Sequence, residues 1–290
     1  MESNVPAYPS VDFLSIGHIC QDVAPGGFVV GGAAAYTAAV AAVLGCRAAI
    51  VTSAAREDEW SQELPGIAVH KSESHHSTVF ENVHTPAGRA QIVRAVADEL
   101  SAADLPLPWT RAPMVYLGPI ANEVDPKLIH MFSNSVVAVG PQGWMRRWDE
   151  QGRVYQVEWE SAADVLPLAA IAFLSTEDLA HSELLEQYRR LTHILVLTDG
   201  ANGCTVYFQD EARTFAAPPA PMVDTTGAGD IFAASYLVRF YQTDGDLWEA
   251  AEFANRIAAH SVSFSGLPAK MTALRDLMVT GFSRPYEQIG

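Results

Sequence analysis

The feature that most constrains the fold is a series of short apolar runs separated by helical segments. Four runs contain only apolar residues: Met114–Leu117, Val136–Val139, Ile171–Leu174 and Ile194–Leu197. A strand that is apolar on both sides must be covered on both faces, which is typical of a parallel sheet between layers of helices. The sequence therefore predicts a three-layer α/β/α fold with a mostly parallel central sheet. Ligands bind beyond the carboxyl ends of the strands in such sheets.

The segment from 66 to 96 departs from this pattern. Its β-branched and polar residues alternate over short stretches such as Thr78-Val79-Phe80 and Ile92-Val93, which predicts a small antiparallel sheet. The chain contains no internal repeat and no low-complexity linker. We therefore expect residues 1–290 to form a single domain.

The charge balance limits the classes of partner. Asp and Glu total 34 against 18 Lys and Arg, which gives a formal net charge of −16. Such a surface repels phosphate backbones and anionic lipids, so we expect neither nucleic acid nor a membrane as a partner. The three cysteines include no Cys-x-x-Cys pair, and residues 1–12 lack the basic and apolar regions of a signal peptide. We therefore expect a cytoplasmic protein.

Most of the chemical information lies in the run Asp224-Thr225-Thr226-Gly227-Ala228-Gly229-Asp230. It leads into a predicted helix over 228–241, whose first N–H groups and positive dipole end have no partner within the helix. Small residues let a phosphate approach the backbone amides of 227–229, which would stabilise charge on a transferring phosphoryl group. Asp230 follows directly, so it is placed to accept the proton of an attacking hydroxyl.

An ordinary helix start is the alternative, with Asp224 or Thr225 as its cap, and Gly-Ala-Gly alone would favour it. The complete run is more specific. It resembles the C-terminal signature of the PfkB family, the ribokinase-like sugar and nucleoside kinases, which has the form Asp-Thr-x-Gly-Ala-Gly-Asp-x-Phe and matches residues 224–232. The resemblance implies a ribokinase-like fold with a small β lid, ATP as the donor and Asp230 as the catalytic base.

The N-terminal part of the chain extends the resemblance. Asp22 and the Gly31-Gly32 pair, which precedes an alanine-rich helix over 33–44, are similar to the family's substrate-binding aspartate and glycine pair. By resemblance, Asp22 would bind substrate hydroxyls, and the backbone at the glycine pair would let the substrate ring sit close. Taken alone, the pair predicts only a turn before a packed helix. The lid would come mainly from 66–96, with a short excursion at 23–30.

The resemblance also implies a nucleotide site in the C-terminal half. The turn over 198–203 is similar to the family's Gly-x-x-Gly turn, although its Asn-Gly pair equally favours an ordinary hairpin. Asn255 matches a family position that lines the adenine pocket, and a simply solvated side chain is the alternative. The nucleotide contacts expected in this way are Thr198, Gly200, Gly203, Thr226 and Asn255.

Two segments depart from the family's patterns. Where many members carry Asn-x-x-Glu, this chain has Ser175-Thr176-Glu177-Asp178, so Mg²⁺ would be held by Asp178 or Glu177; a helix cap is the alternative. The run from Gly140 to Arg146 is similar to the Asp-x-Gln-Gly-x-x-Arg of the myo-inositol kinase branch, with Gly140 in place of the aspartate. Gln142 and Arg146 would contact substrate or phosphate, unless this is an ordinary loop.

These patterns predict an ATP- and Mg²⁺-dependent phosphotransferase acting on a hydroxyl of a small sugar or cyclitol. Two alternatives stay open: a nucleoside kinase of the same fold, and a non-catalytic member that binds sugar or nucleotide. We expect a monomer or a homodimer.

Overall fold

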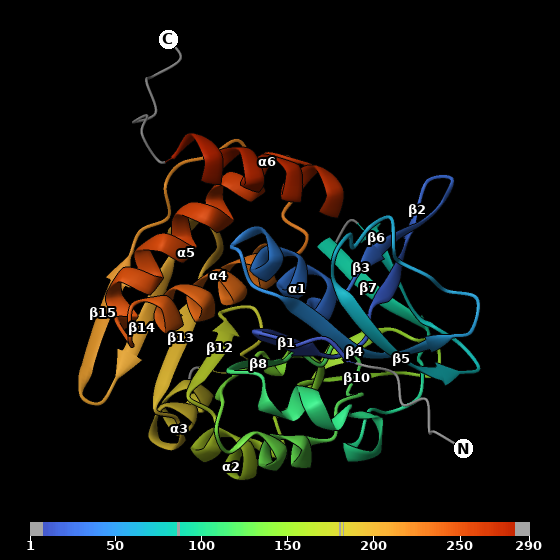
Figure 1. Ribbon diagram of the computed structural model, residues 1–290, viewed down its shortest axis with the longest axis horizontal. Helices are drawn as coiled ribbons and strands as arrows, with labels where there is room; N and C mark the ends of the chain where they lie inside the picture. Colours follow the sequence, from blue (N-terminus) through green and yellow to red (C-terminus); the bar gives the residue numbers. More distant parts are fainter. Residues whose placement is uncertain (1–7, 86–87, 180, 182, 282–290) are drawn as a thin grey trace.

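A nine-stranded sheet forms the centre of the molecule (Figure 1), and the computed structural model describes residues 8–85, 88–179, 181 and 183–281. The strand order is β15-β14-β13-β12-β9-β8-β1-β4-β5; the pairs from β13 to β5 are parallel, and β14 and β15 add an antiparallel edge. The strands are β1 (Phe13–Ile16), β4 (Ala48–Ala55), β5 (Ala68–Ser74), β8 (Met114–Leu117), β9 (Val136–Val139), β12 (Ile171–Ser175), β13 (Ile194–Thr198), β14 (Cys204–Phe208) and β15 (Glu211–Phe215).

Helices cover both faces of this sheet. In Figure 1 the longer helices α1 (Ala33–Val43), α4 (Ala228–Gln242), α5 (Leu247–Ser261) and α6 (Leu267–Thr280) lie above it, and α2 (Ala162–Val165) and α3 (Glu183–Leu191) lie below it. A 3-10 helix, Pro126–Phe132, also lies in the lower layer. None of the helices in the described residues is both long and apolar enough to cross a membrane.

The apolar strands serve two hydrophobic cores, one on each face of the sheet. Adjacent residues of one strand point into different cores: Phe13 into the core under α1 and α4, and Leu14 into the core over α2 and α3. Both are fully buried. This two-sided burial is the reason for the uninterrupted apolar runs, and the predicted α/β/α fold is confirmed.

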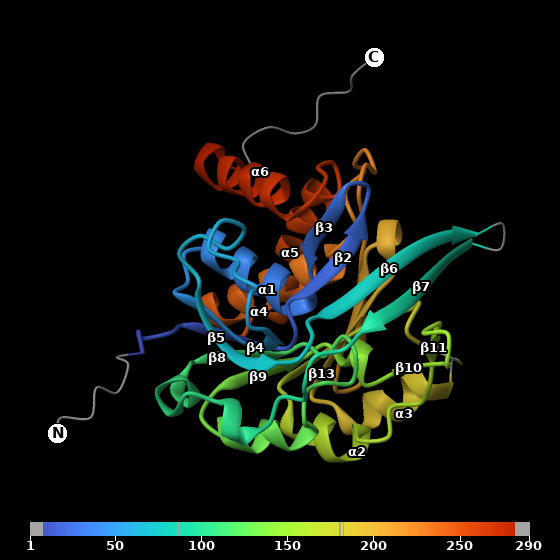
Figure 2. The ribbon, with the colours of Figure 1, turned by 90° about the vertical axis from the view of Figure 1, so that its right-hand side faces the viewer.

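A separate four-stranded sheet forms the lid, in the order β3-β2-β6-β7. Figure 2 shows β6 and β7 projecting away from the body of the protein, beside the short hairpin of β2 and β3. β2 pairs with β6 in parallel, and the two other pairs are antiparallel. The strands are β2 (Cys20–Ala24), β3 (Gly27–Gly31), β6 (Thr78–Thr85) and β7 (Gly88–Ala95).

The expected lid boundary at residue 66 is wrong. Ala68–Ser74 forms β5, which pairs with β4 in parallel at the edge of the main sheet. This edge strand is partly covered along its length and mostly polar, as a lid strand would also be, so its residues do not say which sheet it joins. Residues 86 and 87 of the predicted lid lie outside the described residues.

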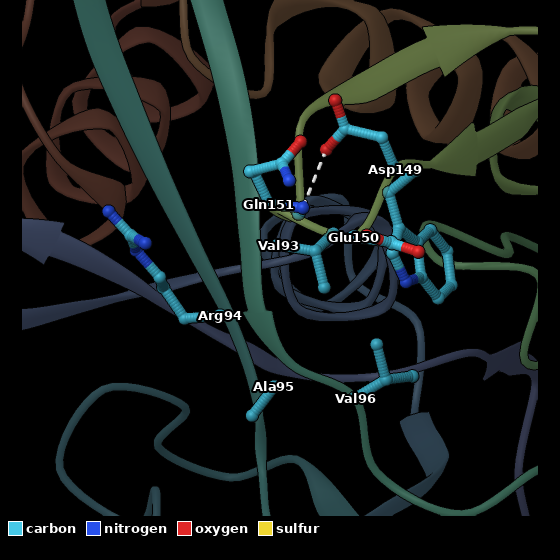
Figure 3. Close-up of a pocket in the computed structure, with 9 residues that line it drawn as sticks. Val93, Arg94, Ala95, Val96, Asp149, Glu150 and Gln151 are labelled. Atoms are coloured by element: carbon cyan, nitrogen blue, oxygen red, sulfur yellow. Dashed lines mark hydrogen bonds between the residues drawn. The ribbon is translucent and has the colours of Figure 1, made fainter.

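The lid is joined to the body through a hairpin that the sequence did not predict, formed by β10 (Arg146–Trp148) and β11 (Val154–Gln156). The amide of Val93 in β7 donates to the carbonyl oxygen of Gly152 at 2.8 Å. The pocket in Figure 3 lies at this junction, between 93–96 and 148–152, where Asp149 accepts a 2.9 Å hydrogen bond from the Gln151 amide. None of its lining residues belongs to the predicted site, so we interpret it as part of the lid attachment.

Candidate active site

The loop before α4 ends at Gly227, whose left-handed backbone conformation (φ 73°, ψ 4°) starts the helix. No side chain caps this end. Within the part of the chain that the structure describes, the amides of Gly227 and Gly229 have no hydrogen-bond partner, whereas the Ala228 amide donates to the carbonyl oxygen of Thr225 at 3.1 Å. Two of the three amides in the predicted anion hole are thus open, and the third is engaged in the turn.

The side chain of Asp224 does not cap α4, so it does not play the role expected for an ordinary helix start. Its Oδ1 accepts the amide of Thr226 at 2.9 Å, and its Oδ2 accepts the amide of Gly266 at 3.0 Å. Asp224 therefore shapes the loop from behind and ties it to the start of α6. The first helical amides remain available to a ligand.

Asp230 lies in the first turn of α4 and is half-buried. The exclusion of water raises the pKa of its carboxyl from 3.8 to about 7; Arg146 opposes this shift, and the negative charge of Asp178 adds to it. A carboxyl with a pKa near neutrality exchanges its proton readily at physiological pH, which is the property of a general base.

Three segments that are distant in sequence meet at this carboxyl. Arg146 is half-buried at the start of β10, where its guanidinium donates to the carbonyl oxygen of Ile120 at 3.3 Å. Burial lowers the pKa of Arg146, and the charges of Asp178 and Asp230 counteract this. Gln142 donates to Asp178 Oδ1 at 3.1 Å. The structure thus brings Gln142, Arg146 and Asp178 together beside the start of α4.

The segment 175–178 forms a turn at the carboxyl end of β12 and does not cap a helix, because α3 begins only at Glu183. Asp178 Oδ2 accepts the amide of Ser175 at 3.0 Å, and its carboxyl is partly exposed on the same side as Asp230. Glu177 is exposed, and its carboxylate makes no hydrogen bond or ion pair with the other described residues.

The donor set suits a hard divalent cation only in part. Carboxylate oxygens are the protein ligands that Mg²⁺ prefers, and two carboxyls whose charges repel each other gain from a cation nearby. Among the described residues, however, no three Asp, Glu, His or Cys side chains cluster closely enough to hold a metal ion. Asp178 fits an Mg²⁺ that takes most of its ligands from phosphate and water.

On the acceptor side, Asp22 of β2 lies over the glycine pair. A Cβ atom on Gly31 would come within 2.2 Å of Asp22 Oδ2, so the carboxylate occupies the space that the missing side chain leaves. Gly32 has φ 97° and packs against the carbonyl oxygen of His18. Burial raises the pKa of the Cys20 thiol, and the charges of both Asp22 and Asp230 add to it. The charges of both carboxylates therefore act on the same buried thiol.

The expected nucleotide residues lie beside the 175–178 turn. Thr198, at the end of β13, donates to the carbonyl oxygen of Leu174 at 3.2 Å. The following 3-10 turn, Gly200–Asn202, leads into β14, which pairs antiparallel with β13. This segment therefore forms a hairpin. Space is open above Gly200, where an added Cβ would meet no atom within 4 Å. Thr176 donates to Asp199 Oδ1 at 2.9 Å, which joins the two turns.

The alternative interpretation of Asn255 as a simply solvated side chain is wrong. It is only 5% exposed, and its amide group donates to the carbonyl oxygen of Phe215 at 3.1 Å. Its nitrogen also approaches the Cys204 sulfur at 3.5 Å. Asn255 therefore fixes the end of β15 against α5 from inside the core.

Two tyrosines that were not predicted from the sequence shape the site. The ring of Tyr36 lies against Gly227. The hydroxyl of Tyr116, at the end of β8, lies where a side chain at 140 would be: a Cβ atom on Gly140 would come within 2.0 Å of it. Tyr116 is one residue before the end of a buried parallel strand, and this position was the available signal. Tyr116 explains why residue 140 is glycine.

Comparison with known proteins agrees with this architecture. Residues 156–273 match the family described as pfkB family carbohydrate kinase. An inositol 3-kinase from Zea mays is 30% identical over 292 residues, covering 90% of this chain and 74% of the relative, and one from Oryza sativa subsp. japonica is 27% identical, covering 98% and 78%. A sulfate complex of a pyrophosphate-dependent kinase in the ribokinase family superposes with a TM-score of 0.77 at 21% identity, covering 90% of this chain and 99% of that one.

The α/β/α core and its β lid have the fold of the ribokinase-like class. The identity to the maize relative, over most of both chains, places it further. This chain belongs to the PfkB family of carbohydrate kinases.

Proposed function

We propose that this carbohydrate kinase transfers the γ-phosphoryl group of ATP to a hydroxyl of a small cyclitol or sugar, with Asp230 as the catalytic base. One observation carries the proposal: a carboxyl with a pKa of about 7 lies in the first turn of α4, next to the open amides of Gly227 and Gly229. A proton acceptor beside donors for a developing anion is the combination that phosphoryl transfer to a hydroxyl uses.

In the proposed reaction, the acceptor alcohol lies between Asp22 and Asp230. Asp230 takes the proton of the alcohol as its oxygen forms a bond to the γ-phosphorus, and the bond from that phosphorus to the β–γ bridging oxygen breaks to release ADP. The amides of Gly227 and Gly229 donate to the oxygens of the moving group, where its charge is spread. Arg146 adds a positive charge beside the same position.

Mg²⁺, when bound, would neutralise charge on the ATP phosphates, and Asp178 is the residue we propose to hold it. Gln142 orients that carboxylate through its 3.1 Å hydrogen bond. Glu177 is exposed and is the weaker candidate. We propose that the nucleotide lies along Thr198 and the open backbone at Gly200. Gly203 ends the 198–203 turn, Thr226 lies near the end of the loop before α4, and Asn255 lies beneath them in the core.

We propose a cyclitol as the first acceptor to test. The support is the inositol 3-kinase relatives, which match most of the chain, together with Gln142 and Arg146 at the site. Inositols carry a hydroxyl on every ring carbon, and a site with Asp22 on one side and Arg146 on the other offers both an acceptor and a donor of hydrogen bonds.

The test is an ADP-release assay with purified protein, ATP and Mg²⁺ across inositols, pentoses, hexoses and nucleosides. We expect a cyclitol or sugar to give the highest kcat/KM and Asp230→Asn to lower kcat by about 10²–10⁴-fold while ATP binding persists. The strongest turnover on a nucleoside would replace the proposed acceptor class, and turnover only with pyrophosphate would replace ATP. Wild-type-like turnover by Asp230→Asn would refute the base assignment.

A further inference from the structure

Lys270 of α6 is a charged side chain in the protein interior. Its relative exposure is 0%. The ammonium nitrogen donates to the carbonyl oxygen of Asp224 at 2.6 Å and to that of Thr226 at 2.7 Å, and it lies 3.9 Å from Asp224 Oδ2. The loop before α4 is therefore held from behind by a cation on another helix.

Burying this cation costs free energy that a methionine would not cost. Desolvation lowers the pKa of Lys270, and the negative charge of Asp224 only partly compensates. Packing alone would favour an apolar side chain at a fully buried position on α6. The ammonium must therefore contribute something that depends on its hydrogen bonds to the loop.

The peptide between Thr226 and Gly227 shows what this contribution is. The described part of the chain has no cis peptide bonds, and in a trans peptide the C=O and the N–H point in opposite directions. Lys270 holds the Thr226 carbonyl toward α6. The Gly227 N–H is thereby directed to the other side, where it has no hydrogen-bond partner among the described residues.

We propose that Lys270 is a positioning residue, whose ammonium fixes the Thr226–Gly227 peptide plane so that the Gly227 amide faces the transferring phosphoryl group. This inference rests on the proposed function of the loop. Lys270 touches neither substrate in this arrangement and acts only through the backbone. The positive charge behind the loop also strengthens its attraction for anions.

The test compares Lys270→Met with a control on the same helix, Leu274→Ala. Leu274 is 1% exposed and lies one turn further along α6, so its truncation weakens the packing of α6 without touching the loop. Both variants are assayed well below their melting temperatures. We expect Lys270→Met to lower kcat about 100-fold, the loss typical of one misplaced anion donor, with the KM of the alcohol changed less than about twofold. Leu274→Ala should keep kcat within about threefold.

Hydrogen exchange provides a readout that needs no turnover. The amides of Thr226 and Ala228 are hydrogen-bonded inside the loop, and we expect them to exchange at least about tenfold faster in Lys270→Met but not in Leu274→Ala. Equal kcat losses in the two variants, or unchanged exchange in Lys270→Met, would overturn the inference. A wild type without turnover on any acceptor rejects the proposed function instead, and the exchange comparison then still decides whether Lys270 fixes the loop.

Discussion

The ring of Tyr36 lies directly against the α-carbon of Gly227. A Cβ atom at Gly227 would come within 2.4 Å of Tyr36 Cδ1. Tyr36 is on α1, one turn after the glycine pair beneath Asp22, and Gly227 begins α4. This contact therefore joins the acceptor side and the phosphate side of the candidate site, and it leaves no room for a side chain at 227.

Gly227→Ala should damage both stability and activity. Alanine at φ 73° is strained, and its methyl group would push the Tyr36 ring and the loop apart. We expect a loss of roughly 1–3 kcal/mol in the free energy of unfolding and a loss of most kcat. Chemical denaturation and the ADP-release assay measure the two effects. An unchanged free energy of unfolding would show that the contact with Tyr36 does not constrain the loop.

Gly229→Ala, two residues further, should separate the two effects. A Cβ atom there meets no protein atom within 4 Å, and the residue is in the first turn of α4. The fold should keep its stability within about 0.5 kcal/mol or gain slightly, because alanine favours the helix. The methyl group would stand in the space proposed for the phosphoryl group, so kcat/KM should fall at least about tenfold. Full activity would place the phosphate elsewhere.

Asp230→Asn should stabilise the protein above neutral pH. The folded-state pKa of about 7 exceeds the ordinary value of 3.8, so the folded wild type binds a proton that the unfolded chain releases, and its stability falls as the pH rises toward 7. Asparagine has no such dependence. The melting temperature of the variant should exceed that of the wild type at pH 8, and the gap should shrink steadily from pH 7 toward pH 4. A gap independent of pH would contradict the raised pKa.

The acid limb of the pH profile of kcat/KM should move in opposite directions in two variants. Arg146 lowers the pKa of Asp230, and Asp178 raises it. Arg146→Met should therefore move the limb to higher pH, and Asp178→Asn should move it to lower pH, whatever each does to the maximum rate. Asp276→Asn on the exposed side of α6 is the control and should leave the limb in place. Shifts of the same sign in both site variants would reject Asp230 as the titrating group.

The sequence predicts the central sheet well because strands that are buried on both faces contain uninterrupted apolar runs. The runs Met114–Leu117 and Val136–Val139 are strands with the predicted bounds, and α4 begins at the predicted Ala228. The assignment of Ala68–Ser74 fails because a half-buried, mostly polar strand has the same composition whichever sheet it joins.

The site is predicted less completely, since its remaining features depend on contacts between distant segments. The hydrogen bond from the Ala228 amide to the Thr225 carbonyl oxygen depends on the detailed geometry of the turn. Two of these contacts join residues that are 24 or more positions apart in the sequence. One is the contact of Tyr116 with Gly140, and the other is the hydrogen bonding of Lys270 to the loop carbonyls. A lone lysine in an amphipathic helix gives no sign in the sequence that it is buried.

The lid is woven from two separated stretches of chain, since β2 pairs in parallel with β6 and β7 is held by the turn at Gly152. Such a lid is not one contiguous segment that could be exchanged as a unit. Transplanting it between relatives would mean exchanging the 20–31 hairpin, the 78–95 pair and the β10–β11 turn together, with every register matched. A single substitution on a lid strand therefore leaves these pairings in place, whereas exchange of one segment alone would break them.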